Sequence, residues 1–136
     1  MNINNAKSEI TFNEYWIENM IFNKNINFEE SEEGIPLKID ISPGYKKEKN
    51  NLYVSVTLNL FEKNNSEFPF YLTLKIVGVF TIEENISDLK LENYKKINCL
   101  AILFPYIRAL VSTITANANV PPLILPPLNI TKLVNN

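Results

Sequence analysis

The sequence predicts an α+β fold, and three observations support this prediction. Apolar and polar residues alternate in several segments before residue 83, apolar residues recur at helical spacing from residue 89 onward, and a proline-rich segment follows at residues 121–127. The chain has 136 residues, of which 46% are hydrophobic and 21% charged. This size and composition are typical of one folded domain, which we take to be residues 1–136.

The two clearest strands lie in the middle of the chain. Residues 52–61 place aliphatic side chains at even positions and polar side chains between them, the period of a half-buried strand. Residues 70–82 continue the alternation after a polar turn, so we expect an antiparallel hairpin. Two less regular strands are expected upstream, at residues 16–28 and 37–42, joined by a solvated acidic loop. We expect residues 1–13 to be flexible.

A long amphipathic helix is predicted after these strands. Apolar residues recur at spacings near three and four from Leu89 to Ile114. Pro105 lacks the N–H that a helix interior needs, so a kink is expected there. Asn117 and Asn119 tolerate left-handed backbone better than most residues, and the helix is therefore expected to end near Asn117.

The residue inventory excludes most catalytic chemistry. The chain has no His, which is the commonest general base near neutral pH and the commonest metal ligand. Its single Cys, Cys99, lies in the apolar helical pattern, so a buried and unreactive thiol is expected. The three glycines are too far apart for a phosphate-binding loop or a dinucleotide fingerprint. We expect no enzymatic activity, no metal and no cofactor.

Charge and processing signals restrict the partners and the compartment. The formal net charge of −2 argues against nucleic acid as a partner, because phosphate neutralisation needs clustered Lys and Arg. The first residues lack the basic start and apolar run of a secretory signal. The longest apolar runs fall far short of the roughly 20 residues that span a membrane. We therefore expect a cytoplasmic protein without a membrane partner.

The proline-rich segment, residues 121–127, is the most informative part of the sequence, and we call it the strap. Two Pro-Pro pairs flank Leu123, Ile124 and Leu125 and hold them in an extended, stiffened conformation. Two interpretations remain open. The strap either covers the sheet and closes the core, or it forms part of a binding surface. Because side chains alternate along an extended chain, one or two of the three would pack inward and leave the others available.

Residues 103–130, LFPYIRALVSTITANANVPPLILPPLNI, resemble the signature of the SecB protein-export chaperones. That family has a similar L-F-P-Y-x-R helix and a proline-rich loop after it. Residues 70–82, FYLTLKIVGVFTI, are similar to its last strand. The resemblance implies a four-stranded antiparallel sheet with a long helix on one face and a proline-rich crossover loop. It also implies dimers that pair by sheet edges and a homotetramer, a dimer of dimers, that forms through the helices.

The function implied by the resemblance is an ATP-independent holdase for unfolded or precursor polypeptides in protein export or quality control. One alternative is a dedicated chaperone of a toxin–antitoxin system, with an antitoxin as partner. Another is a structural or ligand-binding oligomeric module without chaperone activity. Thr73 stands where export SecB is commonly acidic, and residues 131–136 leave only a short remnant of the family's C-terminal helix. Both departures argue against the SecA translocase as a partner.

Two sets of site residues follow from these expectations. The client groove is expected between the strap and aromatic positions of the sheet, lined by Phe22, Phe28, Phe70, Leu123 and Leu125. Even-numbered residues of the last strand are expected to face the helix layer and the subunit interface of the tetramer, namely Leu72, Leu74 and Ile76.

Overall fold

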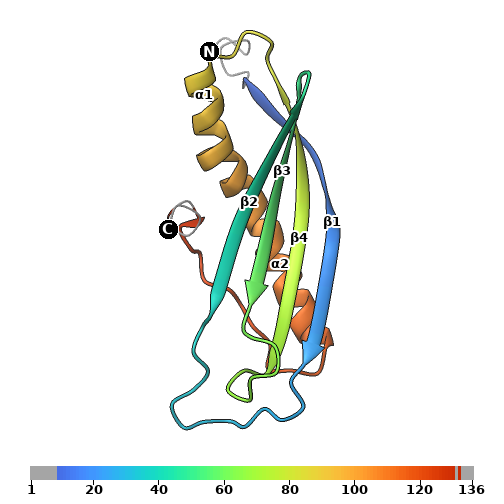
Figure 1. The fold of residues 1–136 in the computed structure, drawn as a ribbon, viewed down its shortest axis with the longest axis vertical. Coiled ribbons are helices and arrows are strands. Elements are labelled where there is room, and N and C mark those ends of the chain that lie inside the picture. The colour runs from blue at the N-terminus through green and yellow to red at the C-terminus, as the bar shows by residue number, and fades with distance from the viewer. Residues whose placement is uncertain (1–8, 131, 133–136) are drawn as a thin grey trace, which may run out of the picture.

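The computed structural model describes residues 9–130 and residue 132, which form an antiparallel sheet with a long helix against one face (Figure 1). The strands are β1 (Ile10–Lys24), β2 (Ile39–Glu48), β3 (Asn51–Leu60) and β4 (Phe70–Ile82). Their order in the sheet is β1-β4-β3-β2, and all neighbouring strands are antiparallel. The predicted α+β class, the four-stranded sheet and the long helix are therefore confirmed.

The inner face of the sheet, which we define as the face toward the helix, follows the predicted alternation. The even-numbered residues of β3 from 52 to 60 are completely buried, as are those of β4 from Phe70 to Ile76. Gly78 continues this face without a side chain, and a Cβ there would lie only 2.6 Å from Cδ2 of Leu103 on the helix. The missing side chain lets the helix approach the sheet at this point.

Strand β1 begins earlier than the sequence pattern indicated. Residues 10–13, which we expected to be flexible, belong to β1, where Ile10 pairs with Ile82 of β4. Residues 1–8, and all but one residue of the expected C-terminal remnant, lie outside the described residues. Two register shifts, between Phe12 and Glu14 and between Ile17 and Asn19, interrupt the pairing of β1 with β4. Such bulges bend a strand and increase its twist.

Strand β2 is longer than expected, because Pro43 and Gly44 do not end it. Proline cannot donate to a ladder, but β2 is an edge strand, where proline is tolerated. At Gly44 a Cβ would lie 2.5 Å from Oγ of Ser55 on β3, so a glycine fits this close approach. A turn at residues 49 and 50 then joins β2 to β3, with Lys49 in the left-handed region at φ 54°. This hairpin was not anticipated.

The helix consists of α1 (Asp88–Asn93), the π-helical turn η2 (Tyr94–Cys99) and α2 (Leu100–Asn117). The Oγ of Ser87 caps its start by accepting a hydrogen bond from the Lys90 N–H at 3.2 Å. The predicted end at Asn117 is confirmed. Helix α2 continues through Pro105, which is exposed, as is Ala101 one turn earlier, so water can reach the carbonyl that loses its partner. The helix also contains an irregularity that the sequence pattern did not indicate, the π-helical turn η2.

The π-helical turn changes which side chains the helix buries. Leu91 and Leu100 are nine residues apart, two and a half turns of an ordinary α-helix, and would lie on opposite faces. Both are buried, at 7% and 0% exposure. Leu89 and Ile97, which the spacing placed on the apolar face, are 74% and 50% exposed. The wider turn of η2 therefore shifts the apolar stripe around the helix.

By length and composition, the 30 residues Asp88–Asn117 would be able to cross a membrane, which the inspection of apolar runs did not anticipate. The helix instead covers the inner face of the sheet, and Leu103, Ile107 and Val111 are completely buried against it. A core helix of a soluble protein passes the same test of length and composition. We therefore interpret this helix as part of the core.

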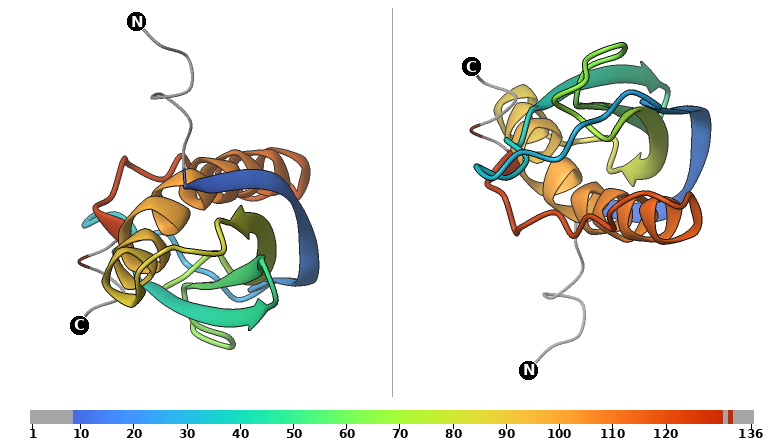
Figure 2. Two further views of the ribbon diagram at one scale, coloured as in Figure 1. Left: turned by 90° about the horizontal axis from the view of Figure 1, so that it is seen from above. Right: turned by 90° about the horizontal axis from the view of Figure 1, so that it is seen from below.

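The strap occupies the part of the inner face that the helix leaves uncovered. The helix crosses the sheet from β2 to β1: Lys95 Nζ lies 5.8 Å from the Tyr45 ring centre, and the Tyr106 and Tyr15 ring centres are 4.4 Å apart. The strap returns on the same side of the sheet as α2, as both views of Figure 2 show. Leu125 is completely buried in the core that results.

Candidate functional site

An apolar cavity of about 100 Å³ lies where the strap passes the connection between β1 and β2. We call it the apolar groove. Its lining is contributed by that connection, by the ends of β3 and β4, and by the strap: Ile35, Leu37, Phe61, Pro69, Phe70, Pro121, Pro122 and Leu123. Ile35 and Leu37 are 37% and 46% exposed. The groove thus presents an apolar wall that is partly open to solvent.

A cluster of phenylalanine rings supports the groove from below. The Phe70 ring stacks on Phe22 with ring centres 5.3 Å apart, and it meets the Phe61 ring edge-on at 4.9 Å. Phe61 in turn stacks on Phe68 at 5.1 Å. Phe61 has φ 64°, an unusual conformation for a bulky residue, and it directly follows the end of β3. These packed rings give the groove a rigid base.

Side chains from one face of α2 hold the strap in place. Arg108 Nε donates to the carbonyl oxygen of Leu125 at 2.9 Å, and the Ser112 hydroxyl donates to that of Leu123 at 3.4 Å. The Leu123 N–H donates to Oγ1 of the buried Thr115 at 3.0 Å. Positions 108, 112 and 115 recur at helical spacing, so they form one polar stripe along α2. This stripe fixes the strap wall of the groove.

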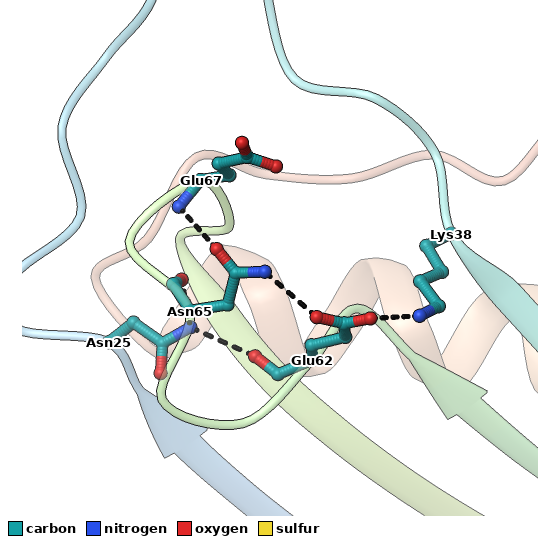
Figure 3. A network of polar contacts seen from close by, with 5 residues as sticks. All are labelled: Asn25, Lys38, Glu62, Asn65 and Glu67. Carbon is teal, nitrogen blue, oxygen red and sulfur yellow. Dashed lines mark hydrogen bonds and ion pairs between the residues drawn. The ribbon is translucent and has the colours of Figure 1, made fainter.

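A polar network, which we call the clasp, fixes the opposite wall; its members are Asn25, Lys38, Glu62, Asn65 and Glu67 (Figure 3). Asn25 Nδ2 donates to the carbonyl oxygens of Glu62, Asn65 and Phe68 at 3.2, 3.2 and 2.9 Å. Glu62 forms an ion pair with Lys38 and accepts a hydrogen bond from Asn65 Nδ2 at 2.8 Å. The clasp therefore ties both ends of the β1–β2 connection to the β3–β4 turn.

The charges of the clasp stabilise each other's ionised form. The hydrogen bond from Lys38 lowers the pKa of Glu62, and the hydrogen bond from Asn65 lowers it further. The hydrogen bond to Glu62 raises the pKa of Lys38. Both side chains remain about half exposed, so the pair acts mainly as a positional tie and contributes little to overall stability.

The structure brings together some of the predicted groove residues and separates others. Phe70 and Leu123 line the apolar groove. Phe28 lines a neighbouring, more polar cavity of about 320 Å³. Phe22 is half-buried and packs behind Phe70. Leu125 lines neither of these two cavities and is completely buried in the core, which corrects its assignment to the groove.

The residues expected at the subunit interface also need correction. Leu72, Leu74 and Ile76 face the helix layer as expected, but each has 0% exposure within a single chain. They have no surface left for a second copy, because the helix of their own chain covers them. Substitutions there would test the core and would say nothing about assembly.

Several groove residues were missed by sequence reasoning. Ile35, Leu37, Phe61 and Pro69 all lie outside the strands of the structure. The alternation that placed Leu37 and Phe61 in expected strands gave no indication of a groove. Ile35 and Leu37 directly follow an acidic loop, and Leu37 had been placed in a strand that begins at Ile39. The sequence did contain one signal for an exposed apolar surface here, namely two apolar residues on either side of Pro36 next to charged residues.

The structure gives Cys99 no accessible chemistry. Cys99 is completely buried, with 0% exposure. This burial raises the pKa of its thiol to about 12. A thiol in this state is a poor nucleophile. Among residues 9–130 and 132, no three His, Cys, Asp or Glu side chains gather where they could hold a metal ion.

The outer face of the sheet is uncharged at the position that the resemblance marks as acidic. The Thr73 hydroxyl donates to Oδ1 of Asn59 at 2.8 Å, and the Tyr71 hydroxyl lies 2.6 Å from Thr73 Oγ1. This neutral cluster satisfies its own hydrogen bonds.

Comparison with known proteins places the chain in a family. The model of the SecB family, described as preprotein translocase subunit SecB, matches residues 4–136. The chain belongs to the SecB family. An uncharacterised protein of Methanocaldococcus jannaschii is 37% identical over 134 residues, covering 96% of this chain and 85% of that protein. The protein-export protein SecB of Idiomarina loihiensis is 34% identical over 94 residues, which cover 68% of this chain and 56% of that protein.

Solved structures share the SecB fold at low sequence identity. A SecB-like chaperone of Mycobacterium tuberculosis, solved in complex with a ChAD peptide from an antitoxin, superposes with a TM-score of 0.73 at 17% identity. The alignment covers 88% of this chain and 91% of that one. A protein of unknown function from Streptococcus agalactiae gives a TM-score of 0.53 at 14% identity, over 87% of this chain and 97% of that one. The predicted SecB-like fold is confirmed.

Proposed function

We propose that this SecB-family protein is an ATP-independent, non-enzymatic chaperone that binds extended apolar segments of unfolded polypeptides. The observation that supports this function best is the apolar groove, with its solvent-open wall at Ile35 and Leu37 and its fixed wall at Leu123. Exposed apolar surface beside a rigid aromatic base suits transient contact with apolar side chains of a client. Family membership favours the same role, in the cytoplasm, in protein export or quality control.

The proposal is tested by aggregation and binding assays without nucleotide. The client is reduced, carboxymethylated α-lactalbumin, which stays unfolded, and its binding is followed by fluorescence anisotropy. The double variant Ile35→Ser, Leu37→Ser should weaken binding, because it makes the open wall polar. The matched control is Leu89→Ser, which changes an exposed leucine on α1, away from the groove.

Unchanged affinity of the groove variant would remove the groove from the proposal. A wild-type protein that binds no unfolded client would instead favour a structural or ligand-binding module. A strict requirement for ATP would contradict an ATP-independent mechanism.

We further propose that the protein assembles into a homotetramer, a dimer of dimers, through β1 and the exposed face of α2. Ile17 and Met20 pair with buried residues of β4, so they lie on the helix side of the sheet, yet they are 43% and 50% exposed. On α2, Ile102 and Tyr106 are 36% and 37% exposed. These four apolar side chains come from the edge strand β1 and from the helix that packs beside it, and a second copy that pairs there would cover them.

The other edge of the sheet is less suited to pairing. Strand β2 carries Pro43, Lys46 and Lys47, and proline and lysine are residues that protect sheet edges from association. Met20→Asp should therefore dissociate the assembly, whereas Leu89→Asp, at 74% exposure, should not. Light scattering after size-exclusion chromatography measures the mass, and a wild-type monomer at micromolar concentration would contradict the proposal.

A second candidate function is a dedicated chaperone for an antitoxin. The similar Mycobacterium tuberculosis chaperone was solved with an antitoxin peptide, and the neutral cluster around Thr73 lacks the acidic side chain that export SecB commonly presents to SecA. Affinity capture from the native cell distinguishes the two functions: many precursor polypeptides would support a general holdase, and one partner an antitoxin chaperone. Retention of SecA would contradict the exclusion of that partner.

A further inference from the structure

The strap turns one side of its backbone toward α2. In an extended chain the N–H and C=O of one residue point to the same side, and those of the next residue point to the opposite side. Leu123 directs both groups toward α2, where its N–H reaches Thr115 at 3.0 Å and its C=O accepts from Ser112 at 3.4 Å. The C=O of Leu125 also points to α2 and accepts from Arg108. Alternate residues of the strap are thus bound to the helix.

By this alternation, the N–H and C=O of Ile124, between Leu123 and Leu125, point away from α2. Among residues 9–130 and 132, no group forms a hydrogen bond with its N–H or its C=O. Its side chain is 77% exposed, and residues 121–129 contain no turn or bend. The strap therefore has an open backbone edge centred on Ile124.

The flanking prolines limit what this edge can bind. By the same alternation, the C=O groups of Pro122 and Pro126 lie on the side of Ile124, but these two residues have no N–H. The edge therefore offers three acceptors and a single donor. Proline at an edge stops further strand pairing, so the strap can accept one short segment and cannot start a growing sheet.

We propose that the backbone edge of the strap, centred on Ile124, binds the backbone of an extended client segment by β-addition. This inference rests on the proposed chaperone function and adds how the client's main chain is recognised. Recognition by β-addition combines main-chain hydrogen bonds with pockets for side chains. The apolar groove is the adjacent pocket, because Pro121, Pro122 and Leu123 of the strap line it.

This arrangement explains a preference for unfolded chains. In a folded protein nearly all backbone N–H and C=O groups are already paired, whereas an unfolded segment has them free. The edge at Ile124 selects for a free, extended backbone of any sequence, and the groove selects for an apolar side chain next to it. Two hydrogen bonds at Ile124, one donated and one accepted, are few enough for release.

Amide hydrogen exchange, measured by NMR on the unaltered protein, tests the proposal directly. With saturating reduced, carboxymethylated α-lactalbumin, exchange of the Ile124 amide should slow at least tenfold, while the exposed amide of Glu30 in the acidic loop should not change. An Ile124 amide that exchanges equally fast in a saturated complex would overturn the β-addition and leave the chaperone function intact. Absence of any complex would overturn both.

A pair of variants isolates the single donor. Ile124→Pro and Ile124→Ala both remove the exposed side chain, but only proline also removes the N–H. Client affinity of Ile124→Pro should be about threefold to tenfold weaker than that of Ile124→Ala. Equal affinities of the two variants, with equal melting temperatures, would overturn the proposal. If proline lowers the melting temperature, the exchange measurement on the unaltered chain decides.

Discussion

Replacing Leu125 by alanine tests whether the strap is part of the core. Leu125 has 0% exposure and packs within the main apolar cluster. Truncating a buried leucine to alanine lowers the free energy of unfolding by about 2–5 kcal/mol. The loss is smaller where the surrounding structure can collapse into the cavity. The strap is a single extended segment, which can settle onto the sheet, so we expect a loss of about 2–3 kcal/mol. For a chain of this size, that corresponds to a melting temperature roughly 10 °C lower.

The neighbouring Ile124→Ala variant is the matched control. Ile124 lies one residue earlier in the same strap but is 77% exposed, so its truncation should cost less than about 0.5 kcal/mol. Thermal unfolding followed by circular dichroism provides the assay, at one protein concentration because self-association makes melting temperatures depend on concentration. Equal losses in the two variants, or no loss in Leu125→Ala, would refute the alternation of the strap described above.

Three further predictions concern the sheet, the clasp and the thiol. Gly78→Ala adds a Cβ 2.6 Å from the buried Leu103, so the free energy of unfolding in urea should fall by about 1–3 kcal/mol; an unchanged midpoint would mean that the helix shifts freely. The pKa of Glu62 is lowered from 4.5, so its contribution to stability is complete above about pH 4.5 and is lost as the pH falls further; Glu62→Gln should flatten this acid limb of the melting temperature, and a limb identical to that of the wild type would argue against the clasp. The pKa of Lys38 is raised from 10.5, so its contribution is complete below that pH and is lost only at more alkaline pH, outside the range of that comparison. Cys99, buried and with a pKa of about 12, should react with a thiol reagent at pH 8 only after unfolding, and fast labelling of the folded protein would contradict its burial.

The sheet was the most predictable part of the molecule, because its central strands bury one face completely. Every even-numbered side chain from Leu52 to Leu60 has 0% exposure. A strand that buries one face completely can pair in few registers, because a shift by one residue would turn these side chains to solvent. Strand β2 was underestimated because Pro43 and Gly44 are typical breakers of a strand. Only the position of β2 at the sheet edge, which the local sequence does not reveal, makes the proline harmless.

The candidate site was less predictable, because loops build most of it. Leu123 and Phe70 were identified from the strap and the strand pattern, and both line the groove. Ile35 and Phe61 also line the groove but were not identified. The position of Ile35 depends on the clasp, and that of Phe61 depends on its own left-handed backbone conformation after the end of β3. Leu125 was misassigned because the sequence shows alternation along the strap without showing which parity faces inward.

The π-helical turn η2 has a consequence for how the length of this chain can vary. A π turn holds one residue more than an α turn, so η2 accommodates one surplus residue without disturbing the elements on either side. Deleting one residue there, such as the exposed Asn98, would leave Leu91 and Leu100 eight positions apart, little more than two turns of an ordinary helix, and so on the same face. The same deletion within α2 would rotate the residues before it by about 100° relative to those after it and pull buried side chains out of the core. Residues 94–99 are therefore the place where relatives with a helix one residue shorter can keep the same packing, and an alignment of such relatives should place its gap there.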